Sequence, residues 1–198
     1  MSDARAFFDA IAPRYDRVYA RPREEMRPRM ERLLALLGSP RDVLDLGVGT
    51  GRELSALLDA GHRVVGVDVS EKMIALCNQR TRPIRCLRAD FWSGLPLPDA
   101  SFDAVLALYG TLAHAPRAGA LADLAREIAR VLRPGGLFHA EAPTPAWAAA
   151  HPAFVDEATG ARIAVVAPSA DEWRAAFARF DVELTESGEE LSVSARLR

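Results

Sequence analysis

Residues 43–52 read VLDLGVGTGR, an apolar run that passes into three alternating glycines. The apolar part, 43–46, predicts a short buried strand. Glycines after a strand let the chain turn tightly and let a ligand approach the backbone N–H groups. Leucines follow at helical spacing in 54–58, so the segment predicts a strand that turns through glycines into a helix. This arrangement is typical of α/β sheets that bind nucleotide-like ligands.

The spacing of the glycines separates the possible ligands. Gly47, Gly49 and Gly51 follow the pattern G-x-G-x-G, whereas a dinucleotide-binding loop is G-x-G-x-x-G and needs a glycine in place of Arg52. A P-loop is excluded because no Gly-Lys-Ser/Thr follows. The carboxylate of Asp45, just before the loop, opposes a pyrophosphate and suits a cationic or polar group.

The rest of the chain alternates short apolar runs with amphipathic helices, which predicts a parallel sheet covered on both faces. Further strands are expected at 64–67, 84–87, 102–108 and 137–141. Further helices are expected at 7–18 with a break at Pro13, from Pro28 to 37, and at 70–77, 121–132 and 169–180. The last two runs, 182–185 and 191–198, alternate apolar and polar residues around a turn and predict an antiparallel hairpin. The expected fold is a doubly wound, Rossmann-like α/β sandwich, with a mostly parallel seven-stranded sheet that ends in this hairpin.

Carboxylates follow three successive strands of the predicted sheet. They are Asp45, Asp68, which lies 17 residues after Gly51, and Asp90. In an open α/β sheet the ligand lies outside the carboxyl ends of the strands, so all three are expected to face one crevice. A carboxylate after the second strand can accept hydrogen bonds from both hydroxyls of a ribose.

Composition narrows the class of protein. A length of 198 residues suits a single domain, and a net charge of −2 argues against nucleic acid or anionic membranes as partners. Cys77 and Cys86 are expected to be reduced thiols, too few for a zinc site, and no metal site is predicted. Residues 1–14 contain acids and are not a signal peptide, and no apolar stretch is long enough to span a bilayer, so a cytoplasmic location is expected.

Four segments together resemble the class I S-adenosylmethionine-dependent methyltransferases. They are VLDLGVGTGR (43–52), VVGVDVSEKMI (64–74), RADFWSGLPLPDASFDAVLAL (88–108) and VLRPGGLF (131–138). The resemblance implies S-adenosylmethionine as methyl donor and S-adenosylhomocysteine as product. It is specific to the superfamily and not to a methyl acceptor.

The resemblance implies roles for residues near the amino-acid end of the cofactor. The backbone of Gly47 and Gly49, in the loop that Gly51 completes, would cradle this end. Asp45 would reach the ammonium group, and the backbone near Leu108 would close over the methionyl part.

The resemblance implies further contacts at the nucleoside end. Asp68, with Val69 beside it, would bind the ribose hydroxyls. Asp90 would accept a hydrogen bond from the adenine amine, with Phe91 alongside the ring.

The resemblance extends more weakly to the N-terminal segment. FFDAIAPRYDRVY (7–19) is similar to the entry of the family's lid, so Tyr15 is expected to touch the cofactor carboxylate. The chain is then one methyltransferase domain, 1–198, with residues 1–37 as a helical lid or cap.

The acceptor is constrained mainly by exclusion. Amino methylation of nucleic-acid bases goes with [DNS]-P-P-[YFW] after the fourth strand, where residues 107–110 read Ala-Leu-Tyr-Gly. A small molecule with an oxygen or nitrogen nucleophile is therefore expected, bound between the N-terminal segment and the connection 142–168, and a protein acceptor stays open as the alternative. His114 is a candidate base or acceptor contact, with an ordinary loop histidine as the alternative. Glu141 is a further candidate to face the site.

Two other functions stay open at this point. One is an NAD-dependent oxidoreductase, which shares the sheet but not the glycine spacing. The other is a non-catalytic domain that binds S-adenosylmethionine. The oligomeric state is not predicted by the sequence.

Overall fold

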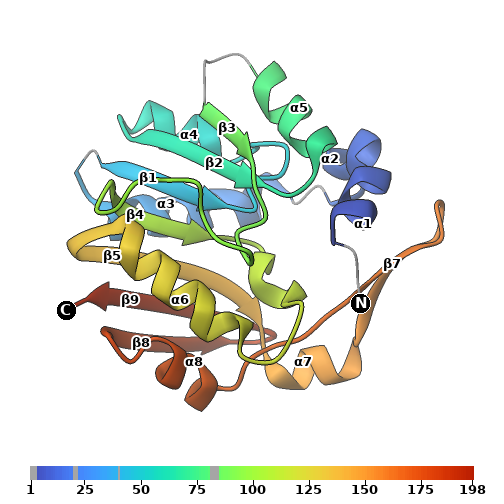
Figure 1. The fold of residues 1–198 in the computed structure, drawn as a ribbon. Coiled ribbons are helices and arrows are strands. Elements are labelled where there is room, and N and C mark those ends of the chain that lie inside the picture. The colour runs from blue at the N-terminus through green and yellow to red at the C-terminus, as the bar shows by residue number, and fades with distance from the viewer. Residues whose placement is uncertain (1–3, 20–21, 40, 81–84) are drawn as a thin grey trace.

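A seven-stranded sheet forms the centre of the molecule in the computed structural model, which describes residues 4–19, 22–39, 41–80 and 85–198. The strand order is β3-β2-β1-β4-β5-β9-β8 (Figure 1). Its strands are β1 (Asp42–Leu46), β2 (Arg63–Asp68), β3 (Arg85–Arg88), β4 (Phe102–Ala107), β5 (Leu132–Pro143), β8 (Phe180–Ser187) and β9 (Glu190–Leu197). Strands β1 to β5 pair in parallel, whereas β9 pairs antiparallel with both β5 and β8. The predicted doubly wound sheet with a C-terminal hairpin is confirmed.

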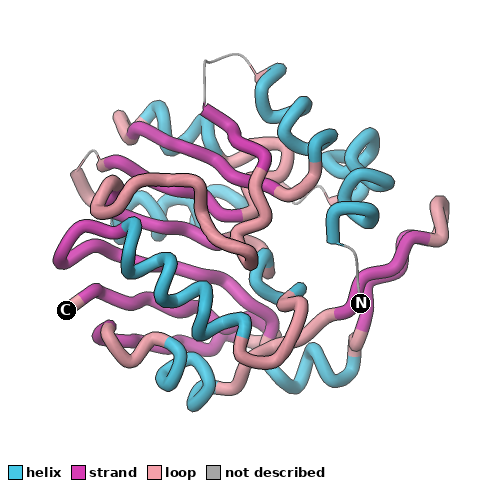
Figure 2. The backbone as a smooth tube through the Cα atoms, in the orientation of Figure 1, coloured by secondary structure: helices cyan, strands magenta, loops and turns pink. Residues whose placement is uncertain are grey.

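Helices cover both faces of this sheet (Figure 2). They are α1 (Ala4–Ile11), the 3-10 turn η1 (Ala12–Arg14), α2 (Tyr15–Val18), α3 (Arg23–Leu37), α4 (Leu54–Asp59), α5 (Glu71–Gln79), the 3-10 turn η2 (Thr111–His114), α6 (Ala120–Val131), α7 (Pro145–Ala150) and α8 (Ala170–Ala176). Apolar residues of α6 and α8 share one core cluster, and those of α3, α4 and α5 share another. None of the helices in the described ranges has the length and apolarity needed to cross a bilayer.

The two cores follow from the alternation of side chains along each strand. In β1, Val43 packs into the cluster of α3 and α4, and Leu44 and Leu46 pack into the cluster of α6 and α8. Asp45 therefore lies on the same face of the sheet as Val43. Asp45 is therefore buried under the helices that cover this face of the sheet.

Some predicted element boundaries are wrong. Helix α3 begins at Arg23 rather than at Pro28, since the acidic Glu24 and Glu25 in its first turn complement the helix dipole. The Ser169–Glu172 capping box is present, but the helix ends at Ala176 and Phe180 already begins β8. Strand β5 begins at Leu132, five residues earlier than expected, and absorbs the Pro-Gly-Gly turn as an irregularity in its pairing with β4.

The connection 142–168 contains structure that its sequence did not predict. Helix α7 is followed by a separate antiparallel pair, β6 (Ala153–Asp156) and β7 (Ala161–Ala164). Ile163 of β7 packs into one apolar cluster with Phe7 and Ile11 of α1 and Met73 of α5. The β6–β7 pair and the N-terminal helices therefore support each other beside the main sheet.

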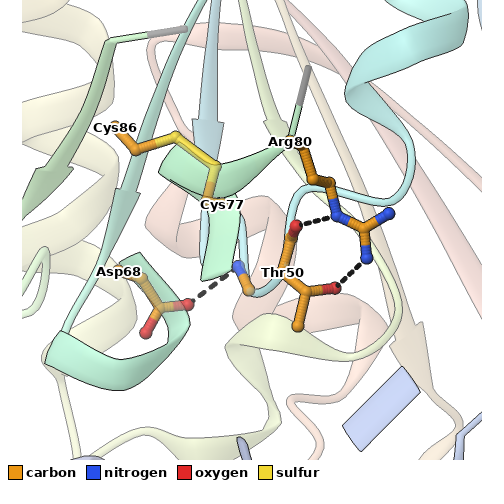
Figure 3. Close-up of a disulfide and its surroundings, with 6 residues drawn as sticks. Thr50, Asp68, Cys77, Arg80 and Cys86 are labelled. Atoms are coloured by element: carbon orange, nitrogen blue, oxygen red, sulfur yellow. Dashed lines mark hydrogen bonds between the residues drawn. A yellow bond between two sulfur atoms is a disulfide. The ribbon is translucent and has the colours of Figure 1, made fainter. Parts of the chain in front are cut away.

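The cysteine prediction is also wrong, because Cys77 and Cys86 form a disulfide (Figure 3). Cys77 lies in α5 and Cys86 in β3, and both pack into the core cluster of α4 and α5. Helix α5 packs directly on β3, which brings two residues separated by nine positions together. The sequence alone showed only their spacing and not this packing.

Candidate functional site

A pocket of about 750 Å³ opens at the carboxyl ends of strands β1 to β5. Its size lies within the range of roughly 300–1,000 Å³ that small-molecule sites occupy. The predicted cofactor and catalytic residues that line it are Tyr15, Gly47, Gly49, Asp68, Val69, Asp90, Phe91, Leu108 and His114. The crevice expected from the strand ends is thus present, and most of the predicted residues meet in it.

The glycine loop forms one wall. Gly47 has a φ of 68°, and a Cβ on it would lie 2.5 Å from Cγ2 of Thr111, so only glycine fits there. The N–H of Gly47 donates to the Val67 carbonyl at 2.8 Å, and that of Gly49 donates to Oδ2 of Asp68 at 2.9 Å. A Cβ on Gly49 would meet nothing closer than 3.9 Å. A ligand can therefore approach the surface of the loop closely, although the N–H groups of Gly47 and Gly49 already donate hydrogen bonds within the protein.

Asp68 connects β2 to this loop. Oδ2 accepts the N–H of Gly49, which is the dashed line at Asp68 in Figure 3. Oδ1 accepts the N–H of Ser70 at 2.8 Å. The pKa of the Asp68 carboxyl is raised overall, because burial outweighs the opposing effect of these backbone hydrogen bonds. Each carboxylate oxygen keeps further acceptor capacity, so this pocket-lining group can also accept ligand hydroxyls.

Asp90 and Phe91 line the pocket from the turn after β3. This strand ends at Arg88, so Asp90 lies two residues beyond the strand end expected for it. Its exposed carboxylate accepts the N–H of Trp92 at 3.0 Å and the hydroxyl of Ser93 at 2.8 Å. Phe91 is buried, with its ring centroid 5.2 Å from that of Trp92.

Two predicted site residues lie elsewhere. Of the residues that the structure describes, Asp45 and Gly51 are outside the pocket lining. Asp45 is buried on the α3 and α4 face of β1, where burial, together with Glu53 and other nearby carboxylates, raises its pKa well above its ordinary value. A Cβ on Gly51 would lie 3.0 Å from Sγ of Cys77, so this glycine packs against α5.

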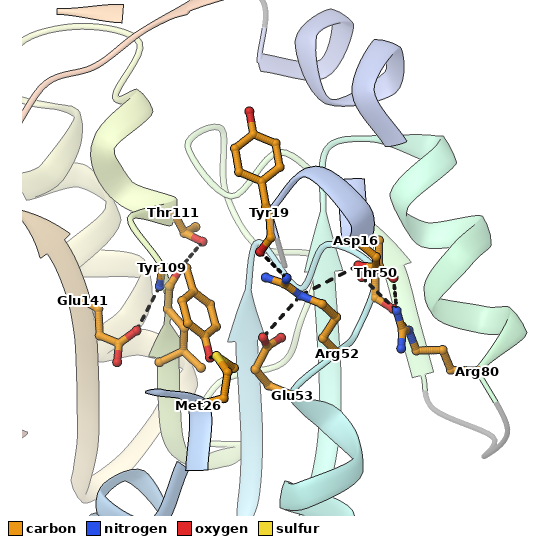
Figure 4. Close-up of polar contacts among 11 residues, drawn as sticks. Asp16, Tyr19, Met26, Thr50, Arg52, Glu53, Arg80, Tyr109, Thr111 and Glu141 are labelled. Carbon is orange, nitrogen blue, oxygen red and sulfur yellow. Dashed lines mark hydrogen bonds and ion pairs between the residues drawn. The ribbon is translucent and has the colours of Figure 1, made fainter. Parts of the chain in front are cut away.

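Arg52 and Glu53 line the pocket and were not predicted. Glu53 is only 8% exposed, and its Oε1 has no hydrogen-bond partner among the described residues. Nε of Arg52 lies 3.6 Å from this oxygen (Figure 4). The pKa of Glu53 is raised overall, because burial outweighs the opposing effects of the Arg52 charge and of a hydrogen bond with the Tyr109 side chain. The one available signal in the sequence was their position directly after the glycines.

Arg52 also organises the aromatic residues of the site. Its guanidinium lies 5.4 Å from the ring centroid of Tyr15 and 5.8 Å from that of Tyr109. It also donates to the Tyr19 carbonyl at 2.8 Å (Figure 4). Burial raises the pKa of Tyr15 to about 12, so its hydroxyl stays protonated. The predicted Tyr15 thus reaches the pocket wall beside a cation.

Glu141, the further candidate, lies at the opposite wall. It accepts the backbone N–H of Tyr109 at 3.0 Å (Figure 4), and it accepts the Nε–H of Arg29 at 2.7 Å. Tyr109 has a φ of 53°, which is uncommon for a residue other than glycine. Arg29 also donates to Glu190 at 2.5 Å, so α3 is held to both β5 and β9. Burial lowers the Arg29 pKa, but the two carboxylates outweigh this effect and raise it overall.

Polar contacts tie the first helices to the same loops. Asp16 of α2 accepts the hydroxyl of Thr50 at 2.6 Å and pairs with Arg80 (Figure 4). Asp9 of α1 accepts the hydroxyl of Ser70 at 2.6 Å. The N-terminal helices are therefore anchored to the loop after β1 and the loop after β2.

His114 lies at the aromatic end of the pocket. Its ring centroid is 5.7 Å from that of Phe8 and 5.9 Å from that of Phe154, whose ring is 5.8 Å from Trp147. Nδ1 lies 2.8 Å from the carbonyl oxygen of Ala164. Because a carbonyl only accepts, Nδ1 carries the proton, which leaves the lone pair of the neutral ring on Nε2. Burial lowers the pKa of His114 from its ordinary 6.5.

Comparison with known proteins agrees with this geometry. Residues 43–136 match a family model described as a methyltransferase domain. The demethylmenaquinone methyltransferase of Beutenbergia cavernae is 38% identical over 154 residues, which cover 74% of this chain and 60% of that protein. The chain therefore spans less than two thirds of the length of this relative.

Solved structures show the same fold over nearly the whole chain. The DhpI–SAH complex has a TM-score of 0.78 at 24% identity, covering 97% of this chain and 94% of that one. The Burkholderia thailandensis 1,6-didemethyltoxoflavin-N1-methyltransferase, with bound 1,6-didemethyltoxoflavin and S-adenosylhomocysteine, has a TM-score of 0.69 at 25% identity and covers 98% and 86%. With the methyltransferase-domain match, the 38% identical relative and the predicted glycine loop, the chain belongs to the class I S-adenosylmethionine-dependent methyltransferase family, whose fold these solved structures share.

Proposed function

We propose that this chain binds S-adenosylmethionine in the pocket at the strand ends and transfers its methyl group to a small molecule. The observation that carries the proposal is that the glycine loop, the Asp68 carboxylate and the partnerless Oε1 of Glu53 all line one pocket. The loop lets a ligand approach the backbone, Asp68 accepts hydrogen bonds from hydroxyls, and Glu53 is a buried anion. Together these features fit a ligand that combines a nucleoside with a cationic amino acid.

The charges along the pocket support a cationic cofactor. Among the described lining residues, the acids outnumber the basic residues. The acids are Glu53, Asp68, Asp90, Glu141, Glu189 and Glu190, and the arginines are Arg5 and Arg52. An excess of carboxylates favours a cationic ligand over an anionic one. NAD, with its pyrophosphate, suits this lining less well than S-adenosylmethionine does.

Bound S-adenosylmethionine supplies a methyl group on a sulfonium, which is already activated for transfer. The task of the chain is then to hold the acceptor in line and to exclude water, and orientation contributes much of the acceleration. The pocket walls that Phe8, Trp147 and Phe154 form are suited to a flat, largely apolar ring. The acceptors in the names of demethylmenaquinone and didemethyltoxoflavin methyltransferases support this choice.

We assign to His114 the role of the base. Its lone pair on Nε2 receives the proton of an acceptor O–H or N–H, and the contact of Nδ1 with Ala164 holds the ring in that tautomer. The lowered pKa keeps the imidazole neutral near pH 7. A positioned base of this kind contributes about 10²–10⁴-fold to a rate.

The N-terminal helices complete the pocket in this proposal. Residues between Ala4 and Tyr19 line it, as do Trp147 and Phe154 of the connection after β5. We propose that the chain acts as one methyltransferase domain in which these two segments form the acceptor side, with the N-terminal helices as its cap. The cytoplasmic location stays a prediction.

Calorimetry of the full chain with S-adenosylmethionine, S-adenosylhomocysteine and NAD tests the cofactor. We expect micromolar binding of S-adenosylmethionine and S-adenosylhomocysteine and no binding of NAD. Binding of NAD alone would support the oxidoreductase alternative instead. Transfer of a labelled methyl group to a panel of hydroxylated and N–H-bearing aromatic rings tests the activity. Cofactor binding with an acceptor side that takes no ring would favour a non-catalytic domain.

A further inference from the structure

Glu53 is a buried anion that faces a ligand pocket without a hydrogen-bond partner for one oxygen. It lines the pocket, is more than nine-tenths buried at 8% exposure, and its Oε1 lacks a partner among the described residues. A buried carboxylate is costly unless a cation or hydrogen-bond donor satisfies it. Arg52, at 3.6 Å, is too distant to donate a good hydrogen bond to that oxygen. The pocket therefore has a built position for a cationic donor.

The place of Glu53 along the chain identifies which part of the cofactor reaches it. Glu53 directly follows the glycine loop, whereas Asp68 lies on the neighbouring strand and Asp90 beyond the strand after that. If Asp68 binds the ribose, the nucleoside extends over β2 and β3, and the amino-acid end extends toward β1 and α4. The α-ammonium group is a compact cation with three N–H donors, and it can supply the hydrogen bond that Oε1 of Glu53 lacks.

Asp45, to which the family resemblance gave this role, is positioned differently. It lies on the α3 and α4 face of β1 and outside the pocket lining. Its carboxyl is close enough to Glu53 for the two charges to interact, but of the two residues only Glu53 lines the pocket. Figure 4 shows the Glu53 carboxylate directed toward Arg52, beside Tyr109.

We propose that Glu53, rather than Asp45, binds the α-ammonium group of S-adenosylmethionine, and that the α-carboxylate faces Arg52. This inference rests on the proposed function and names a residue of the same site. Opposite charges of the zwitterion then meet opposite charges of the protein. The reverse orientation would bring the ammonium against Arg52 and the carboxylate against Glu53.

Ligands with and without the amino-acid end provide the test. The affinities of the full chain for S-adenosylhomocysteine and for 5′-methylthioadenosine, which keeps the nucleoside and lacks the amino acid, are measured by calorimetry. Glu53→Gln is expected to weaken S-adenosylhomocysteine binding about 10- to 100-fold, the value of a hydrogen bond to a charged group. The affinity for 5′-methylthioadenosine should stay unchanged. Asp45→Asn is the matched control and should not separate the two ligands.

Each outcome decides between the two assignments. Equal weakening of both ligands by Glu53→Gln means that Glu53 only shapes the pocket, and no weakening excludes it; either result overturns the inference. Selective loss in Asp45→Asn alone would restore the original assignment. Thermal unfolding of both variants confirms that they are folded. A wild-type chain that binds neither ligand would refute the proposed function itself, whereas wild-type binding with an unaffected Glu53→Gln refutes only this inference.

Discussion

The Asp68 carboxylate accepts the backbone N–H of Gly49 at 2.9 Å, which ties the end of β2 to the glycine loop after β1. The same carboxylate accepts the N–H of Ser70 at the start of α5 and lines the pocket. One side chain therefore shapes the loop and also presents acceptor oxygens to a ligand.

Asp68→Asn is expected to weaken S-adenosylhomocysteine binding about tenfold or more, because a charged acceptor is replaced by a neutral amide. The amide oxygen can still accept the N–H of Gly49, but the amide nitrogen then faces the N–H of Ser70 and that hydrogen bond is lost, so thermal unfolding of the variant is measured beside its affinity. Isothermal titration calorimetry measures the affinity. Asp90→Asn is a useful comparison, since the exposed Asp90 carboxylate is expected to contribute less. An unchanged affinity in Asp68→Asn would contradict its ribose contact.

His114 is expected to titrate below 6.5, because burial lowers its pKa more than the Ala164 contact raises it. The folded imidazole then stays neutral while the unfolded one binds a proton, so this group destabilises the fold as pH falls below 6.5. The free energy of unfolding of the wild type should decline more steeply below pH 6.5 than that of His114→Asn. The comparison is needed since His62 and His139 also have lowered pKa values.

Nuclear magnetic resonance of the imidazole nitrogens checks the same residue directly. A neutral ring with its proton on Nδ1 is expected, because the group facing Nδ1 is the carbonyl oxygen of Ala164. A proton on Nε2, or a pKa at or above 6.5, would argue against the proposed base. With an acceptor in hand, His114→Asn should lower the rate of methyl transfer by about 10²-fold or more.

Arg29→Gln is expected to lower the free energy of unfolding by about 3 kcal/mol, since it leaves the buried Glu141 without its cation. Chemical denaturation measures the change. Arg27→Gln on the same helix is the matched control, because the Arg27–Glu31 pair is largely exposed and should contribute no more than about 0.5 kcal/mol. Adding Glu141→Gln to Arg29→Gln should restore part of the loss. Equal effects of the two arginine substitutions would show that the pairing contributes little.

Removal of the Cys77–Cys86 disulfide by a double serine substitution is expected to cost about 2.5 kcal/mol, given the short loop of nine positions that it closes. Alkylation followed by mass spectrometry checks whether the bond is present. Protein unfolded without reductant should take up no label, and protein that is reduced and unfolded should take up two. Full labelling of the unreduced protein would show that the thiols are free, as the sequence first suggested. A reducing cytoplasm opposes the bond, so this measurement also bears on where the chain functions.

Local patterns account for the parts of the fold that were predicted. The strand–glycine–helix segment at 43–52, the Ser169–Glu172 capping box and the alternation in the last hairpin all act between residues close in sequence. Strands β6 and β7 were not predicted because they are four residues long and are stabilised by packing against α1. The early start of α3 was hidden by Pro28, which suggested a first turn at the wrong residue.

The site divides in the same way. The sequence predicted Gly47, Gly49 and Asp68 as site residues, because strand ends and glycine spacing can be recognised within one segment. Glu53 was missed because an acid at a helix start has many ordinary explanations. Its significance depends on burial and on a carboxylate oxygen without a partner, which are properties of the packed chain.

The sequence by itself determined the strand–helix alternation, the family and the loop on which a cofactor site is built. Only the tertiary structure decided which carboxylates reach the pocket. Alternation along β1 turns Asp45 away beneath α3 and α4, while the turn through the glycines brings Glu53 to the pocket wall. The tertiary structure also decided the tautomer of His114, because that tautomer depends on a carbonyl 50 positions away in the sequence. Which face of β1 the helices α3 and α4 cover, and which carbonyl the His114 ring meets, depend on how separate elements pack together, and hydrophobic periodicity within one segment carries no information about that packing.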